Sequence, residues 1–137
     1  MFYALLSAVF AACTAILAKI GVKDVDSNLA TAIRTIVILC FAWGIVFYQG
    51  TVKNLPSISR FSLLFLVLSG FATGLSWLFY FKALQMGNAS QVAPIDKLSI
   101  VITIILSIFI LKEHVSLTVM AGAAMMAGGA ILVAVGK

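Results

Sequence analysis

Three charged residues interrupt long apolar runs in this sequence, Arg34, Asp96 and Lys97. In an apolar environment an ionised side chain faces a cavity or a partner of opposite charge, because leaving it unpaired costs at least about 2.5–3.5 kcal/mol. Arg34 is a permanent cation and favours a carboxylate or another anionic group, which Asp96 would supply if the fold brings the two together. These residues are therefore predicted to bind charged groups of a ligand or to exchange a proton.

Asp96 and Lys97 follow Pro94, which lacks a backbone donor and opens the local hydrogen-bond ladder of a helix. Neighbours on a regular helix point about 100° apart, so the two side chains are not expected to pair directly. The alternative is that a helix begins at Asp96, where the helix dipole favours an anion, and that Lys97 extends to the membrane surface. The sequence leaves both interpretations open.

The remaining residues with chemical capacity form no catalytic or metal-binding pattern. His114 is the single histidine, and Cys13 and Cys40 stand in apolar runs without metal-ligand spacing, where we interpret them as buried small apolar residues. No hydrolase nucleophile motif or phosphate-binding glycine loop is present. We therefore expect no enzyme activity, no metal and no cofactor. The nine basic residues are scattered rather than clustered, which does not favour a nucleic-acid partner.

Composition places the chain in a lipid bilayer. Of its 137 residues 64% are hydrophobic and 9% are charged, against about 25% charged in soluble domains. Charge-free runs cover residues 1–18, 35–52, 61–81, 98–111 and 115–136. Because about 20 apolar residues span the hydrocarbon and backbone polar groups must pair within it, such runs predict membrane helices.

We predict an all-α integral membrane protein with a single domain over residues 1–137. Asp26, Ser27 or Asn28 would cap the second span. The fourth charge-free run is too short to span unless it extends back through Pro94, and short, proline-interrupted segments indicate a transporter's binding site. The predicted spans are residues 2–20, 29–48, 61–84, 90–111 and 117–135.

Five spans place the two termini on opposite sides of the membrane. Basic residues then divide almost evenly between the sides: Lys53, Arg60 and Lys112 on one, and Lys19, Lys23, Lys82 and Lys137 on the other. Orientation follows the excess of Lys and Arg on the cytoplasmic side, and this excess is small here. We therefore expect that the chain can insert both ways, so that two copies form the inverted repeats typical of transporters.

Small residues recur at helical spacing in the third and fifth spans. Such faces let helix backbones approach closely in lipid. They serve either assembly with a second chain or packing within one subunit, and the sequence leaves the two alternatives open. Trp77 suits a cavity wall or an interfacial aromatic belt. The helix-packing candidates are Gly70, Gly74, Gly122, Ala124, Gly128 and Gly129.

The stretch YFKALQMGNASQVAPIDKLS, residues 80–99, resembles the third-to-fourth helix signature of the EamA family of the drug/metabolite transporter superfamily. Leu111-Lys112-Glu113 and the Gly/Ala-rich last helix also resemble that family, and Ala32-Ile33-Arg34 does so more loosely. The resemblance implies five-helix units paired as inverted repeats, usually two in one chain, which surround a central cavity with ten helices. This chain holds one unit.

The resemblance further implies a transporter of small polar or amphipathic metabolites or drugs in the bacterial inner membrane. A second copy, which makes an antiparallel homodimer, or a paralogue would complete it, and Asp96, Lys97, Arg34, Pro94 and Trp77 would bind substrate or a proton. Two alternatives stay open. The chain is a non-transporting subunit that stabilises a partner, or it is part of a flippase for lipids or lipid-linked sugars.

Overall fold

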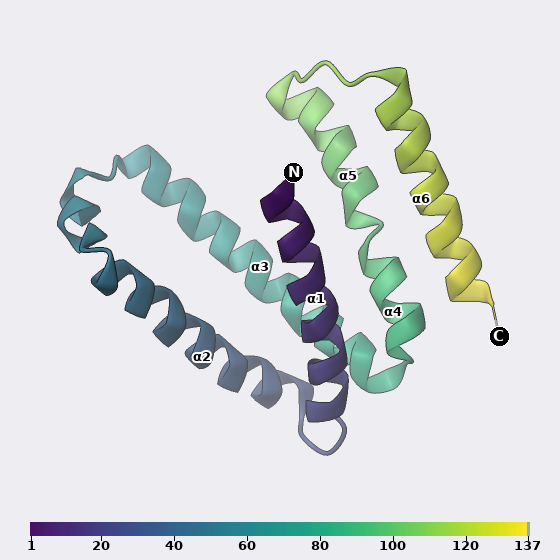
Figure 1. The fold of residues 1–137 in the computed structure, drawn as a ribbon, viewed down its shortest axis with the longest axis horizontal. Helices are drawn as coiled ribbons and strands as arrows, with labels where there is room; N and C mark the ends of the chain where they lie inside the picture. The colour runs from purple at the N-terminus through teal and green to yellow at the C-terminus, as the bar shows by residue number, and fades with distance from the viewer. Residues whose placement is uncertain (137) are drawn as a thin grey trace. The chain divides into compact units, whose positions relative to one another are not determined.

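Every regular element within residues 1–136, which the computed structural model describes, is a helix (Figure 1). Lys137, one of the charges counted for topology, lies outside the described residues. Two compact units are formed, one by residues 17–85 and the other by residues 1–16 with those from 86 onward. Five helical segments are long and apolar enough to cross a membrane: α1 (Phe2–Gly21), α2 (Ser27–Tyr48), α3 (Arg60–Met86), the segment Ala89–Leu111 and α6 (Leu117–Val135).

Short polar side chains fix where two of the helices begin. Asp26 is the cap of α2, because its carboxylate Oδ1 accepts hydrogen bonds from the backbone amides of Asn28 at 2.9 Å and Leu29 at 3.1 Å. Ser116 caps α6 in the same way through the amide of Val119. These bonds satisfy amides that the first turn of a helix leaves without partners.

The unit of residues 17–85 is held by what we call the helix junction, where the end of α1, the start of α2 and the end of α3 meet. Its fully buried side chains are Val22, Ser27, Phe81 and Leu84. A 3₁₀ helix, η1 (Thr51–Ser57), joins the other ends of α2 and α3. Gly50 makes the turn into it with a φ of 66°, a left-handed conformation that glycine adopts without strain.

Two side chains bind the junction through backbone carbonyls. The Lys19 ammonium donates to the carbonyl of Leu84 at 2.6 Å, and the Gln85 amide donates to the carbonyls of Val22 at 3.3 Å and Val25 at 3.0 Å. Carbonyls at a helix end and in a loop lack intrahelical partners, so these bonds satisfy them while they join α1 and the loop after it to α3. Lys19, counted for topology as a residue at a span end, is therefore a cross-helix donor.

The second unit contains the interrupted fourth span and α6. The span consists of α4 (Ala89–Asp96), α5 (Ser99–Leu106) and a π-helical turn, η2 (Ser107–Leu111). α6 runs back beside α4 and α5 (Figure 1), and its buried side chains are Ala123 and Ala130. The Gln91 amide donates to the carbonyl of Gly136 at 3.1 Å, which joins the start of α4 to the end of α6.

Gln85 offers a direct test of the helix junction. Replacing Gln85 with Leu removes the donor to two carbonyls of the α1–α2 connection, and we expect the free energy of unfolding to fall by about 1–2 kcal/mol. The measurement is reversible unfolding of the purified chain in mixed micelles. The matched control is Gln49→Leu, because the Gln49 side chain is exposed and makes no hydrogen bond within residues 1–136. Equal stability of the two variants would contradict the account of the junction.

Candidate functional site

The fourth span loses regular α-helical hydrogen bonding next to its charged residues. The amide of Leu98 donates to the carbonyl of Ile95 at 3.0 Å, three residues back rather than four, and the amide of Ile100 donates to Lys97 at 3.0 Å. Pro94 has no amide to donate and its ring crowds the preceding turn. The sequence predicted one helix over residues 90–111, whereas α4 ends at Asp96 and α5 begins at Ser99.

Asp96 and Lys97 form an ion pair at this interruption. The Lys97 Nζ lies 3.3 Å from the Asp96 Oδ2, and the side chains are 55% and 33% exposed, respectively. The expectation that they do not pair was wrong, because it assumed a regular helix. The chain leaves regular α-helical geometry at Lys97, and the long lysine side chain bends back to the carboxylate. Helix precedes the pair as well as following it, so Asp96 does not begin the span. Asp96 lies about 10 Å along the helix axis from Ala89, the first residue of α4, at a rise of 1.5 Å per residue.

In the unit of residues 17–85, Arg34 of α2 lies over an aromatic surface of α3. Its guanidinium carbon is 4.2 Å from the centroid of the Phe81 ring and 6.0 Å from that of Trp77. Both distances are within the range in which a cation is attracted to an aromatic face. Phe81 is 1% exposed, so the ring is fixed by its neighbours and holds the guanidinium in one place.

No carboxylate of its own unit, residues 17–85, neutralises Arg34. Its Nη1 is inaccessible to solvent and has no hydrogen-bond partner there. The carboxylates of its own unit are Asp24 and Asp26 in the α1–α2 loop, and Asp26 is occupied in capping α2. The sequence offered Asp96 as the partner of Arg34, which stays a prediction, and within its own unit the carboxylate of Asp96 pairs with Lys97. Arg34 therefore carries a positive charge whose counter-ion is not supplied by its unit.

Sequence reasoning assigned Trp77 to a cavity wall or an aromatic belt but missed Phe81 as the surface on which Arg34 rests. The two aromatic residues are four apart on α3 and therefore share a helix face, which is the signal that could have linked them. Sequence reasoning also missed Lys19 and Gln85 as cross-helix donors. Nothing in the local pattern indicates these bonds, because the residues that they join are 60 to 65 positions apart.

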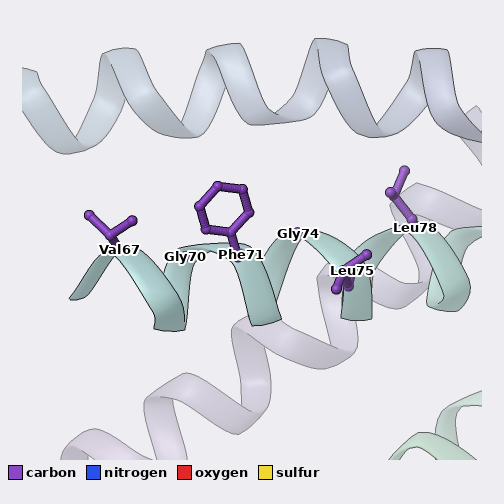
Figure 2. Close-up of a pocket in the computed structure, with 6 residues that line it drawn as sticks. All are labelled: Val67, Gly70, Phe71, Gly74, Leu75 and Leu78. Carbon is purple, nitrogen blue, oxygen red and sulfur yellow. The ribbon is translucent and has the colours of Figure 1, made fainter. Parts of the chain in front are cut away.

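The glycines of α3 border a shallow apolar hollow of about 420 Å³ (Figure 2). Gly70 and Gly74 contribute only backbone to it, and a Cβ atom added at either would meet nothing within 4 Å. They therefore do not serve close helix contact within the described residues, and their role in assembly stays a prediction. The hollow is lined by Val67, Gly70, Phe71, Gly74, Leu75 and Leu78.

The small residues of α6 divide between two roles. Ala123 and Ala130 are buried, on the helix that packs beside α4 and α5. Ala124, Gly128 and Gly129 are exposed and Gly122 is half-exposed, and a Cβ atom at any of the three glycines would meet nothing within 4 Å. Packing within the unit thus uses the alanine positions, and the glycine positions are open.

The cysteines and acidic residues form no metal site. Within residues 1–136 no three His, Cys, Asp or Glu side chains lie close enough to hold a metal ion. Cys13 and Cys40 are exposed on their helices, so the interpretation of both as buried residues was wrong. An apolar side chain in a membrane span need not be buried by protein, because lipid is an equally apolar environment.

Comparison with known proteins defines the class. The chain matches the model of the EamA-like transporter family over residues 1–135 and belongs to that family. It is therefore a multi-pass membrane protein of a transporter family, as the resemblance predicted. An uncharacterized transporter in the cobO 3′ region of a Sinorhizobium species is 51% identical over 134 residues, which cover 98% of this chain and 95% of that relative. No solved structure matches.

Pro94 can be tested as the cause of the interruption. Replacing Pro94 with Ala supplies an amide for the carbonyl of Ser90 and removes the crowding ring, so α4 and α5 should approach one continuous helix. We expect hydrogen exchange at residues 94–100 to slow by roughly tenfold or more, since better-formed helical bonds open less often. The measurement is hydrogen–deuterium exchange of the purified chain. Unchanged exchange would show that another residue causes the break.

Proposed function

We propose that this chain is one half of a transporter for small polar or amphipathic metabolites or drugs. It acts as a dimer, by alternating access, in the bacterial inner membrane. The observation that carries the proposal is the break in the fourth span, where a charged pair stands well inside a helix that is otherwise apolar. Interrupted helices are where transporters bind substrate near the middle of the bilayer.

The Asp96–Lys97 pair has the chemistry for reversible binding. Each charge is held by one long contact of 3.3 Å and stays partly exposed, so a substrate can replace either partner. An anionic group would bind Lys97, and a cationic group or a proton would bind Asp96. When the site is empty the pair re-forms and reduces the cost of holding two charges in an apolar region.

Two features support action as a dimer. The relative that shares 51% identity matches over 95% of its own length, which leaves that relative no room for a second five-span unit. The basic residues of this chain are nearly balanced across the membrane, which favours insertion in both orientations. Two chains in opposite orientation would provide the paired repeats from which many transporters are built.

The role of the charged pair is tested with vesicles that contain the purified chain and are preloaded with radiolabelled amino acids and small organic amines. Asp96→Asn combined with Lys97→Met should lower efflux roughly tenfold or more, because both charge-dependent contacts are lost. The matched control is Lys23→Met with Asp24→Asn, an exposed pair of neighbours in the α1–α2 loop. If the efflux rate of the Asp96→Asn/Lys97→Met variant equals that of the wild type, the assignment of the charged pair as the substrate site is contradicted. Wild-type efflux no faster than that of empty vesicles would contradict transport of these solutes.

Dual orientation is tested in cells with reporters fused to the C-terminus, one active only in the periplasm and one only in the cytoplasm. We expect comparable signals from both, because the excess of basic residues does not select one orientation. Adding two Lys residues to the η1 loop should then drive the chain into one orientation. A signal from a single reporter in the unmodified chain would exclude the antiparallel homodimer and favour an oppositely oriented paralogue.

A further inference from the structure

Arg34 is the one feature of the helix junction that the junction's own packing does not explain. Buried arginines are normally balanced by carboxylates or bind several acceptors. Here the guanidinium rests on Phe81 and near Trp77, while Nη1 lacks a hydrogen-bond partner among the described residues. The ring contact orients the guanidinium without neutralising it. A guanidinium that is held in place without a counter-ion is suited to bind an anionic group of a ligand.

We propose that Arg34 binds the carboxylate of the transported solute, and that the solutes of this transporter are monocarboxylates with an apolar body. The inference rests on the proposed transport function and names the substrate class. It uses a group separate from the Asp96–Lys97 pair.

Charge balance selects a monoanion. The other cation of the junction, Lys19, is already engaged with the carbonyl of Leu84. Lys82 on α3 is exposed. One guanidinium offers its planar edge to the two oxygens of one carboxylate, whereas a phosphate dianion would need a second positive group. The surroundings select the apolar body, since Arg34 is flanked by the rings of Phe81 and Trp77.

The position of Arg34 favours a solute over a lipid headgroup. α2 begins at Ser27, so Arg34 lies about 10 Å along the helix at 1.5 Å per residue. The headgroup region is only about 5–8 Å deep on each side of the hydrocarbon. Arg34 is also held against α3 by Phe81 rather than extended along the helix towards its end.

The test uses the fluorescence of Trp77, whose ring centroid lies 6.0 Å from the guanidinium carbon. Trp43→Phe leaves Trp77 as the single tryptophan, and phosphate-free maltoside micelles exclude lipid headgroups. The probes are phenylacetate and its neutral analogue phenylacetamide. We expect phenylacetate to give a saturable change with roughly tenfold or greater preference over phenylacetamide, because the charged hydrogen bonds are lost with the amide.

Variants assign the preference to Arg34. Arg34→Gln should abolish it, and Arg34→Lys should retain it with weaker binding, because lysine keeps the charge but loses the planar fork. Lys82→Met, which removes an exposed cation of α3, should leave it unchanged. Should the glutamine variant fail to fold, the lysine variant decides, and unchanged affinity there would overturn the inference. Equal binding of both probes would also overturn it, as would saturation by phosphatidylglycerol without any response to phenylacetate.

The two proposals fail in different ways. Binding of phenylacetate that depends on Arg34, with no efflux of amino acids, amines or phenylacetate from preloaded vesicles, would contradict the transport function and leave the binding site standing. Efflux that is unchanged by Arg34→Gln, together with equal binding of the two probes, would contradict the carboxylate site and leave transport standing.

Discussion

The structure depends on the requirement that every backbone polar group inside a bilayer finds a partner within the protein. Long helices meet this requirement by themselves, so the chain is a set of five apolar spans. The requirement makes any interruption costly, and the break after α4 is therefore informative. The amide of Lys97 is shared between the carbonyls of Ala93 and Pro94, and the amide of Leu98 bonds the carbonyl of Ile95, three residues back instead of four. Asp96 and Lys97 stand at this opening in an otherwise apolar segment, and they pair with each other there.

Side-chain donors perform the same task where helices end. Lys19 and Gln85 bind carbonyls at the ends of α3 and α1, respectively. The buried core of this junction is small and includes Val22, Phe81 and Leu84, which suits an environment in which lipid does not drive apolar side chains together. The same packing that fixes Phe81 fixes Arg34 above it. Stability and the proposed ligand binding thus share one contact, and a substitution at Phe81 would affect both.

The sequence was sufficient for features that depend on local composition. Span number followed from the lengths of the apolar runs, and Asp26 was among the three residues expected to cap the second span. Pro94 indicated that the fourth span is interrupted, but the change in bonding at Lys97 and Leu98 could not be located, because it depends on how the chain relaxes after the proline. The pairing of Asp96 with Lys97 was missed for the same reason. The surroundings of Arg34 and Lys19 depend on helix packing across 43 or more positions, for which one sequence carries no periodic signal.

The central claim is that one chain supplies half of a transport pathway. The most direct measurement is single-molecule photobleaching of chains that each carry one fluorophore on a C-terminal tag, reconstituted at low density in lipid bilayers. The account predicts that most spots bleach in two steps, with the fraction of two-step spots unchanged as the protein-to-lipid ratio is lowered severalfold. Predominantly single-step bleaching, under conditions in which the vesicles still transport solute, would show that one chain is sufficient and would contradict the claim.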